Sequence, residues 1–588
     1  MNETNLKVVS RQMMRLLPTQ ILLAAVGAIE AIVSSYFASN YIGIDAMSVV
    51  GVFAPVSLLI GAIGNLLTTG SAIVCGKYLG RNEQDKVQKV FSLDLLLTAL
   101  IALLFSALFL IMGLFDLTGI FTRDPAVRPL FNRYLIGQVV GFLPIMLGAQ
   151  LPAYLVMENR QALGTIASVV HIVVDVIMNI LFVQMLHMGI FGLALASAIS
   201  AWVFLAVQAV AFLSGKASLR LKFGNIAWKD TLSILRIGLP AAAGNAYQTL
   251  RGIIVNNLMA AFLGSVAISA FAAANNLLSF FWAIPAGMLA VSRLMISVSV
   301  GEEDRQTLTD IMRVMFKRYI PIMCVICAVI MLCAEPFTRL FYRDPSEPVY
   351  MMTVWGFRIL PLCMPLSIIV MHFSCYGQAS DKTVLVNVVS VLDGVVCVAG
   401  FTALLIRGMG IYSVYTANVL NGVVCALAFV VYSCLKRKRF PTNMEQLMVI
   451  PDDFGVSPDA RIDISVQSMD EVLMVSRRVT EFCRKRGIDE RRVYLASLCM
   501  EETAGNIVEH GFTKDNRRHS IDIRVVHKND DVIMRVKDDC VPFDPETRRQ
   551  LNDPGNRMKN IGIRIVYQSA QSVEYHNILG LNVLTIRI

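Results

Sequence analysis

The chain has 588 residues, of which 55% are hydrophobic and only 16% are charged, and its formal net charge is +9. Soluble proteins carry about 25% charged residues, so this composition excludes an ordinary soluble protein over most of the length. The shortage of charge ends near residue 436, where the sequence changes to that of a cytosolic domain. We therefore expect an all-α membrane bundle followed by a small α+β domain.

Apolar runs long enough to cross a bilayer, about 20 residues each, recur along the first 435 residues. We expect about twelve spans, near 17–38, 46–74, 91–115, 130–155, 161–186, 190–214, 233–261, 264–298, 319–341, 350–376, 383–406 and 410–434. The first run has no cleavage site of small residues before the next span, so no removable signal peptide is expected.

Lysines and arginines between the runs predict the orientation. They are more than twice as frequent in one set of loops, around 77–89, 216–236 and 305–318, as in the other set, around 123–133, 339–343 and 407. Cytoplasmic loops are enriched in these residues, so the richer set and both termini should be cytoplasmic, in a cytoplasmic (inner) membrane. The positive charge is then a topology signal, and nucleic acid is not an expected partner.

The two halves of the apolar region share short sequences. FTRDP at 121–125 matches FYRDP at 341–345, MGIF at 188–191 matches MGIY at 409–412, and LLP at 16–18 matches GLP at 238–240, each about 220 residues apart. The last pair is expected to open the first and seventh spans. Six spans per half would insert both halves in the same orientation, which gives a two-lobed bundle suited to alternating access.

This duplication resembles the multidrug and toxic compound extrusion (MATE) family. So do the segment TTGSAIVCGKYLGRNEQDKVQKVFS after the second span and the segment VHIVVDVIMNILFVQMLHMGIFGLALASAIS at 170–200. The resemblance covers residues 10–435, with an N-lobe at 1–220 and a C-lobe at 221–439. It implies an antiporter that exports a small organic solute, often cationic, in exchange for H⁺ or Na⁺.

Ionisable residues inside spans are costly, so they mark cavities or partners. Glu30 lies one helical turn before Ser34, where the family places an aspartate, and on the same face. We expect Glu30 either to carry the coupling ion or to form a static pair with Arg251, its approximate repeat equivalent. Asp175 stands where the family has an aspartate, and it either couples or fixes its helix. Further candidates are His171, Arg293, Arg358, His372 and Asp393.

Arg251 and Arg293 also make the C-lobe positive, because the middles of spans seven and eight contain no acidic residue. This pattern favours an anionic or zwitterionic solute in that lobe.

After a linker at 440–460, residues 461–588 alternate as strands and helices. Strands are expected at RIDISVQ, SIDIRVVH, DVIMRVKD, SVEYH and NVLTIRI, and helices near 469–486, 488–510 and 560–571. The alternation of apolar and polar residues in the strands predicts one buried sheet face. The expected domain is an α+β sandwich, with a mixed sheet on one side and helices on the other.

Three motifs of this domain are typical of a nucleotide site. In EETAGNIVEHG, Glu502 and Asn506 share a helix face. An asparagine carbonyl suits Mg²⁺, and a neighbouring carboxylate can deprotonate an attacking group. VKDDCVPFDP at 536–545 ends a strand in an acidic turn, where a buried carboxylate can accept a hydrogen bond from adenine. RMKNIGIRIV at 557–566 places Gly562 at a helix start, where free N–H groups bind phosphate.

Together the motifs resemble the GHKL ATPase fold, and the short segment 546–560 is similar to the anti-sigma-factor serine kinase branch. The resemblance implies ATP and Mg²⁺ as cofactors, with Glu502 as general base, Asn506 as the Mg²⁺ ligand and Asp538 as the adenine reader. It also assigns to the nucleotide site His510, Gly511, Phe543, Arg557, Lys559 and Gly562. Two residues replace that branch's glycines, Cys540 and Asn560, and their Cβ atoms narrow the room for the nucleotide.

These observations predict an ion-coupled exporter whose tail acts as a regulator or as a Ser/Thr kinase of a soluble partner. One alternative is a membrane-tethered signalling kinase whose bundle senses a ligand without transporting it. Another is a flippase for a lipid-linked precursor, in which a cationic cavity matters more than Glu30.

Overall fold

The computed structural model describes residues 3–122, 124–214, 217–222, 224, 226–456, 458–514, 519–528, 530–542 and 561–588. The chain forms two compact units. The larger unit contains residues 16–302 and 315–449, and the smaller contains residues 1–15, 303–314 and 450–588. The smaller unit therefore combines the C-terminal domain with two short segments from the apolar part of the chain.

The first half of the membrane region consists of long helices. These are α1 (Glu3–Phe37), α2 (Ile44–Gly80), α3 (Gln84–Leu114), α4 (Val127–Met157), α5 (Gln161–Asn179) and α6 (Gly189–Leu213). Short π-helical segments follow α1 and α5, η1 (Ala38–Ile42) and η3 (Ile180–Met185). Helices predominate because the bilayer core offers no water to backbone groups, which must find their partners within the segment.

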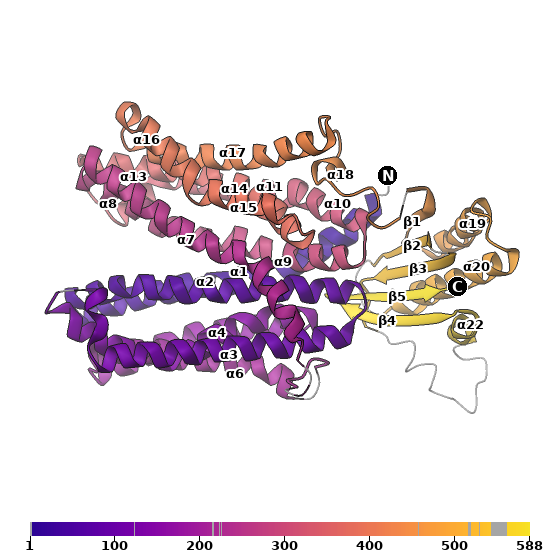
Figure 1. The fold of residues 1–588 in the computed structure, drawn as a ribbon, viewed down its shortest axis with the longest axis horizontal. Helices are drawn as coiled ribbons and strands as arrows, with labels where there is room; N and C mark the ends of the chain where they lie inside the picture. Colours follow the sequence, from indigo (N-terminus) through magenta and orange to yellow (C-terminus); the bar gives the residue numbers. More distant parts are fainter. Residues whose placement is uncertain are drawn as a thin grey trace. The chain divides into compact units, whose positions relative to one another are not determined.

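The second half repeats the pattern with more interruptions. Its helices are α7 (Thr231–Phe262), α8 (Ser265–Phe281), α9 (Ala283–Gly301), α10 (Arg305–Val314), α11 (Ile320–Leu332), α12 (Ala334–Arg339), α13 (Pro348–Ile359), α14 (Cys363–Ala379), α15 (Thr383–Val391), α16 (Cys397–Met409), α17 (Tyr412–Arg437) and α18 (Met444–Leu447). The π-helical η5 (Met315–Tyr319) and η7 (Leu392–Val396) join neighbouring helices. In Figure 1 the indigo and purple helices gather in one bundle and the magenta and orange helices in a second.

Among the described residues, eleven helices are long and apolar enough to span a membrane, where the sequence predicted about twelve. The difference is the predicted span 233–261. It is a helix of 32 residues, α7, but it is not among the eleven. Asn245, Gln248, Arg251, Asn256 and Asn257 all lie on α7 and lower its hydropathy. The segment 233–261 is one of the apolar runs predicted from the sequence, and these polar residues keep α7 out of the eleven.

The paired prolines lie within helices, and their place at the openings of the two spans stays a prediction. Pro18 lies inside α1, and Pro240 lies inside α7. Helix α1 begins at Glu3, well before the apolar run predicted from residue 17, and α7 begins at Thr231, close to the run predicted from residue 233. A proline in a membrane helix is tolerated where neighbouring groups satisfy the freed backbone carbonyl.

The two halves meet closely where α2 contacts α7 and α9. A Cβ at Gly238 would lie 2.8 Å from the carbonyl carbon of Leu66, so the backbones of α7 and α2 nearly touch. Tyr78 also donates a hydrogen bond to Asp230, with 3.0 Å between the oxygens, and Lys77 forms an ion pair with Asp381 at 3.1 Å. The halves are therefore in tight contact at the end of α2 that the sequence predicts to be cytoplasmic.

The C-terminal domain contains a five-stranded sheet in the order β1-β2-β3-β5-β4. The strands are β1 (Arg461–Val466), β2 (Ile521–Lys528), β3 (Asp531–Asp538), β4 (Ser572–Ile578) and β5 (Leu581–Arg587). Each neighbouring pair is antiparallel, with Ile523 opposite Val536 and Val536 opposite Leu584. The expected mixed sheet is therefore wrong. Hairpins join β2 to β3 and β4 to β5, and consecutive strands joined in this way run antiparallel.

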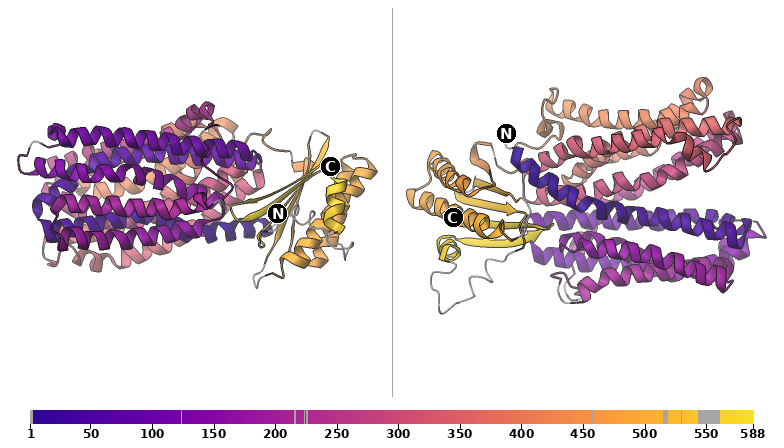
Figure 2. Two further views of the ribbon diagram at one scale, coloured as in Figure 1. Left: turned by 90° about the horizontal axis from the view of Figure 1, so that it is seen from below. Right: turned by 180° about the vertical axis from the view of Figure 1, so that it is seen from behind.

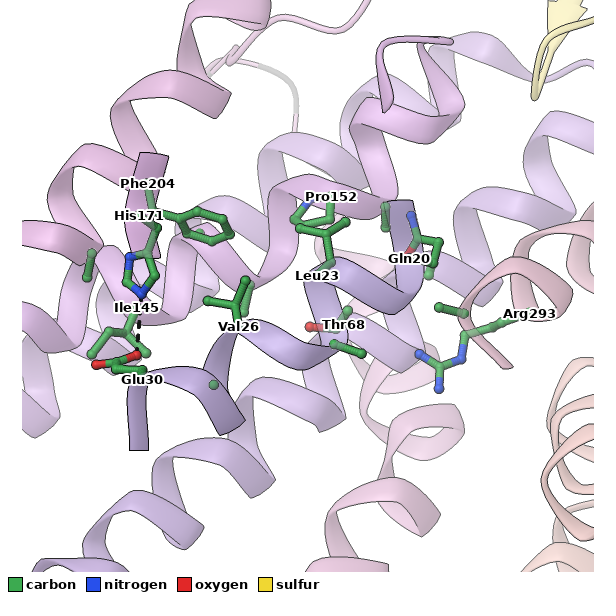
Figure 3. Close-up of a pocket in the computed structure, with 18 of the residues that line it drawn as sticks. Gln20, Leu23, Val26, Glu30, Thr68, Ile145, Pro152, His171, Phe204 and Arg293 are labelled. Carbon is green, nitrogen blue, oxygen red and sulfur yellow. Dashed lines mark ion pairs between the residues drawn. The ribbon is translucent and has the colours of Figure 1, made fainter. Parts of the chain in front are cut away.

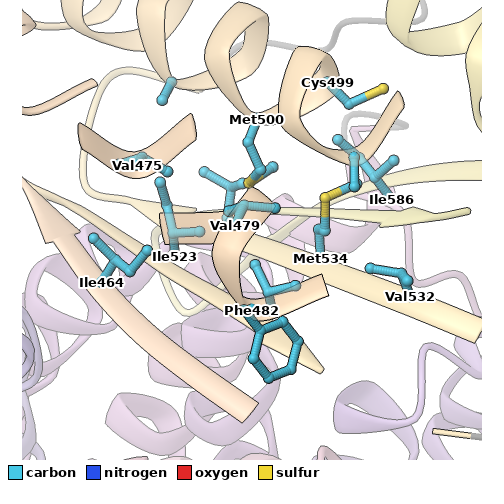
Figure 4. Close-up of a cluster of buried hydrophobic side chains, with 14 of the residues drawn as sticks. Ile464, Val475, Val479, Phe482, Cys499, Met500, Ile523, Val532, Met534 and Ile586 are labelled. Carbon is cyan, nitrogen blue, oxygen red and sulfur yellow. The ribbon is translucent and has the colours of Figure 1, made fainter. Parts of the chain in front are cut away.

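Helices α19 (Met469–Lys485), α20 (Glu490–Asn506) and α22 (Ile561–Ser569) accompany the sheet, and Figure 2 shows the helices on one of its faces. Asp489 caps α20 by accepting a hydrogen bond from the Arg492 N–H at 3.0 Å. Apolar residues of α19 and α20 pack on alternate residues of β2 and β3, including Val479, Ile523 and Met534 (Figure 4). This buried layer fixes the positions of the motifs at the strand and helix ends.

The opposite face of this sheet is polar and holds a buried ion network. Arg524 of β2 contacts Asp463 of β1, with 2.7 Å between Nε and Oδ1. The same guanidinium reaches Asp304, with 2.5 Å between Nη1 and Oδ1, and Lys537 lies 3.6 Å from the other oxygen. The Asp304 side chain is only 3% exposed. The segment 303–314 is thus held on the sheet by charges from two strands.

Asp522 lies on the same polar face, and we expect it to make the stability of the sheet depend on pH. Burial raises the pKa of this carboxyl to about 7, with smaller opposing contributions from Ser465 and Lys537. Because the folded pKa exceeds the ordinary value, the stabilisation by the bound proton is complete below about pH 4 and is lost as the pH rises through 7. We expect amides of β2 and β3 to exchange hydrogen faster at pH 8 than at pH 6 after correction for intrinsic rates.

Asp522→Asn should remove this acceleration, because the amide has no proton to lose. Asp531→Asn, at the opposite end of the β2–β3 hairpin, is the matched control and should keep the wild-type dependence. An Asp522→Asn protein with an unchanged pH dependence would show that another group is responsible.

Candidate functional site

A cavity of about 380 Å³ lies between the two halves of the membrane region. Its walls come from α1, α2, α4, α5 and α6 of the first half and from α9 of the second. Most of the lining is apolar, including Leu23, Val26, Ile145 and Phe204 (Figure 3). A mostly apolar cavity with a few polar groups is typical of a binding site for an organic molecule.

One end of this cavity carries an acid–imidazole pair. Oε2 of Glu30 lies 3.4 Å from Nε2 of His171, and their side chains are 26% and 4% exposed. The ring of His171 also packs edge-on against Phe204, with 5.4 Å between centroids. The α1 helix thus places a carboxylate that is open to the cavity against a buried base. The predicted static pair between Glu30 and Arg251 is therefore wrong.

Asp175 lies behind this pair, one turn further along α5 and almost completely buried. Its Oδ1 accepts hydrogen bonds from Asn179 at 3.3 Å and from Ser200 at 3.5 Å, whereas its Oδ2 has no hydrogen-bond partner within the described part of the chain. Ser34 is also buried, one turn after Glu30, and it does not line the cavity. Of the four first-half residues discussed, Glu30 and His171 alone face the cavity.

The two C-lobe candidates form a separate group. Nη1 of Arg251 donates to the backbone carbonyl of Asp393 at 3.4 Å. Oδ1 of Asp393 accepts a hydrogen bond from Asn421 at 2.7 Å. None of the three lines the cavity. The position of Arg251 in the repeat therefore suggested the wrong partner. The repeat indicates where a residue lies along its helix but not in which direction its side chain points.

In the C-terminal domain, the first nucleotide motif lies on α20 and the π-helical segment η9 (Ile507–Gly511) that continues it. Glu502 and Asn506 stand one turn apart and are partly exposed. The Asn506 side-chain amide donates to the Glu502 backbone carbonyl at 2.7 Å. With the amide nitrogen so engaged, Oδ1 of Asn506 is the atom that can ligate a cation. His510 is exposed at the end of the segment.

The acidic turn after β3 contains a buried carboxylate. Asp538 is 5% exposed, and its Oδ1 accepts hydrogen bonds from Asn582 of β5 at 2.7 Å and from the Cys540 N–H at 3.0 Å. Burial raises the pKa of Asp538, although both donors oppose the shift. Asn582 in turn accepts from the Tyr575 hydroxyl at 2.8 Å. The turn is thus fixed from the neighbouring strand.

The two motifs meet through Gly511 and Cys540. A Cβ at Gly511 would lie 3.1 Å from Sγ of Cys540, so the glycine makes room for the thiol. The side chain of Cys540, which stands where the resembled branch has a glycine, is buried against the end of η9. Helix α20 also contacts α22, whose second residue is Gly562. The fold therefore brings the end of η9 and the acidic turn together, and it packs α22 against α20.

Four residues named from the sequence lie outside the described residues and have no structural account: Phe543, Arg557, Lys559 and Asn560.

The geometry described so far is that of a duplicated, two-lobed helical membrane protein joined to an antiparallel α+β domain with a nucleotide-type site. The chain matches the MatE family over residues 23–181 and again over residues 240–402. It therefore belongs to the MatE family, and the repeated match agrees with the duplication predicted from short sequence pairs. Residues 467–588 match the histidine kinase-like ATPase domain. No curated protein matches the chain.

Solved structures share the membrane fold. A MATE structure in complex with MaD3S has 18% identity and a TM-score of 0.68, and covers 75% of this chain and 97% of its own. An outward-facing multidrug resistance MATE transporter of the MOP superfamily has 18% identity and a TM-score of 0.67, with 73% and 96% covered. A MOP superfamily transporter from Pyrococcus furiosus, described as having a binding pocket of reverse polarity, has 18% identity and a TM-score of 0.66, with 73% and 97% covered.

Sequence reasoning missed two residues that organise these sites. Asn582 fixes the acidic turn, but at the start of an apolar strand it gives no signal in the sequence. Asp304 binds Arg524 and Lys537, although in the charged stretch GEEDR it is indistinguishable from a solvated loop residue. In both cases the partner is distant in sequence.

Proposed function

We propose that this protein exports a small organic solute across a membrane by exchange with H⁺ or Na⁺, and that its tail binds ATP with Mg²⁺ and regulates transport. The observation that carries the proposal is the cavity between the lobes, with Glu30 and His171 at one end. A carboxylate beside a base can take up a cation or a proton in competition with the solute. The unpartnered Oδ2 of Asp175, one turn behind His171, offers a second acceptor for the coupling ion.

Replacement of Glu30 by glutamine tests this role. In proteoliposomes with an imposed pH or Na⁺ gradient, the wild type should move ethidium against its concentration gradient. Glu30→Gln should reduce this flux about 100-fold, because a neutral amide cannot exchange charge. Glu335→Gln is the matched control, since Glu335 is an exposed carboxylate paired with Arg358 at 3.3 Å. Wild-type flux in Glu30→Gln would refute the coupling role, and ethidium binding without gradient-driven flux would favour a sensor.

Three features of the tail support the binding of ATP and Mg²⁺. Asp538 is positioned to accept a hydrogen bond from adenine, Asn506 Oδ1 to ligate Mg²⁺, and the N–H groups at the start of α22 to bind phosphate. Glu502, one turn from Asn506, is the base in this proposal if the site transfers phosphate to a Ser or Thr of a partner protein. When bound, the nucleotide supplies the transferable phosphate and the negative charge that these groups recognise.

Asp538→Asn should weaken ATP binding to the full chain about 10- to 100-fold, because this factor corresponds to the free energy of one hydrogen bond to a charged group. Asn506→Ala should remove the effect of Mg²⁺ on binding and leave metal-free binding nearly unchanged. Titration of a fluorescent ATP analogue with and without Mg²⁺ measures both effects. Asp531→Asn, at the far end of the same strand, should bind as the wild type does. Equal binding by Asp538→Asn would place adenine elsewhere.

Regulation is supported by two segments of the membrane region that belong to the smaller unit. Asp304 and its neighbours are bound by Arg524 and Lys537, and Arg305 donates to the backbone carbonyls of Asp452 and Phe454 at 3.3 and 3.4 Å. The segment 303–314 connects α9, which carries cavity residues, to α11.

The second segment is the start of α1. Arg11 forms an ion pair with Asp539, the residue after the proposed adenine reader, and Gln12 donates to the backbone carbonyl of Leu579. The same continuous helix carries Glu30. A nucleotide that moves the acidic turn would therefore act on α1 through the pair of Arg11 and Asp539.

A further inference from the structure

The cavity has opposite charges at its two ends. Glu30 and His171 lie at one end, and Arg293 of α9 lies at the other, near Gln20 (Figure 3). Between them the lining is apolar, with Leu23, Val26 and Phe204 as its large members. Such a lining has room for an apolar body between two charged groups, and a compact cation fills only part of it.

Arg293 places a partly exposed guanidinium within a membrane helix. Among the described residues, no carboxylate forms an ion pair with Arg293, its Nε is buried without a hydrogen-bond partner, and its side chain interacts with the thiol of Cys375. By contrast, Arg251 on α7 donates a hydrogen bond to the backbone carbonyl of Asp393. A cation inside a membrane span is costly unless it is paired, so an arriving anion would supply what the protein does not.

The separation of the charged ends follows from α1. Gln20 and Glu30 both line the cavity and are ten residues apart, which corresponds to about 15 Å along a helix. Two groups of a small, compact zwitterion cannot reach both ends. An elongated molecule can, with its cationic group at Glu30 and its anionic group at Arg293.

We propose that the preferred solute is an elongated amphipathic zwitterion, bound with its cationic group at Glu30 and its anionic group at Arg293. This inference rests on the proposed function only in taking the cavity as the solute site. Arg293 is the residue that distinguishes the zwitterion from a simple cation, because a planar guanidinium binds a carboxylate or phosphate through two parallel hydrogen bonds.

The test compares three probes with one carbon chain: ω-aminododecanoic acid, its methyl ester, which has only the positive charge, and its N-acetyl derivative, which has only the negative charge. Binding to the full chain in lipid nanodiscs is measured by calorimetry. We expect the zwitterion to bind about 10- to 100-fold more tightly than either derivative. Equal or weaker binding of the zwitterion, or no binding at all, would overturn the proposal.

Variants test which residue causes the preference for the zwitterion. Arg293→Gln should bind the acid and the ester equally. It should bind the ester as tightly as the wild type does, and this binding also shows that the variant is folded. Arg293→Lys should keep part of the preference, and Arg358→Gln, an arginine paired with Glu335 outside the cavity, should keep all of it. A preference for the acid that survives in Arg293→Gln would refute the role of Arg293. Ethidium flux that depends on Glu30, together with equal binding of the three probes, would refute this inference and leave the proposed function standing.

Discussion

Gly80→Val should reduce transport about 100-fold while the protein still inserts and folds. Gly80 is the last residue of α2, and a Cβ there would lie 2.7 Å from the Glu302 nitrogen and 2.9 Å from the Gly301 carbonyl carbon. Gly301 makes the reciprocal contact, since its Cβ would lie 2.8 Å from the Lys77 carbonyl carbon. These neighbours are backbone atoms, which cannot move aside as a flexible side chain can.

A valine at this crossing forces α2 and α9 apart. Overpacking of this kind costs about 1–3 kcal/mol or more. A transporter alternates between two conformations, and the variant should remain in the conformation in which these helix ends are separated, because that conformation avoids the clash. We expect flux of ethidium to fall to about 1% of the wild type, the factor that corresponds to about 2.7 kcal/mol. Hydrogen exchange of residues 297–302 should rise, because the contact that protects them is gone.

Gly64→Val is the control for this experiment. Gly64 lies on the same helix, and no atom lies within 4 Å of a Cβ placed there. This variant should transport at a rate within about twofold of the wild type, as expected for a substitution without a close neighbour. Transport at the wild-type rate by Gly80→Val would mean that the contact between these helix ends is not part of the cycle.

Asp304→Asn will release the segment 303–314 from the sheet of the C-terminal domain. Burial alone would raise the pKa of Asp304, but the charges of Arg524 and Lys537 more than offset it and hold the pKa well below its usual range. Loss of one member of a buried ion network costs about 3–5 kcal/mol, because the remaining charges stay buried without compensation. Protection of residues 303–310 against hydrogen exchange should fall accordingly.

The neighbouring residue provides the matched control. Glu303 pairs with Lys528 at 2.8 Å, but both side chains are almost half exposed, so Glu303→Gln should cost about 0–1 kcal/mol. Asp304 itself should stay ionised between pH 5 and 8, because its pKa is lowered and its stabilisation is lost only as the pH falls below the ordinary carboxyl range. Equal exchange of residues 303–310 in Asp304→Asn and in the wild type would contradict the role of the network.

The same variant separates transport from its regulation. Asp304→Asn should retain gradient-driven flux, since Asp304 does not line the cavity, and should lose the response of flux to Mg²⁺ and ATP. A variant that keeps the full response would show that the tail acts through the start of α1 alone.

The sequence was sufficient for features that depend on composition and local pattern. Long apolar runs predicted the membrane helices, matched pairs such as FTRDP and FYRDP predicted the duplication, and alternation predicted the β2–β3 hairpin. The prediction of a mixed sheet failed because strand direction depends on how the chain connects β1 to β2 through two helices, which alternation does not report.

Side-chain partners were the least predictable features. The repeat suggested Arg251 as the partner of Glu30, whereas α1 turns Glu30 toward His171 on α5. The buried network of Asp304 joins residues more than 150 positions apart, and each of them is an ordinary surface charge when viewed in the sequence. The separation of two residues in the sequence does not show whether their side chains meet, so such contacts can be identified only in the folded structure.

The most direct test of the account is gradient-driven flux by the full chain in proteoliposomes, with and without Mg²⁺ and ATP on the side of the tail. We predict that a pH or Na⁺ gradient alone drives ethidium uphill, and that ATP changes the rate several-fold in the wild type but not in Asp538→Asn. Flux that requires ATP and proceeds without any ion gradient, or no flux under any gradient, would contradict an ion-coupled exporter with a regulatory nucleotide site.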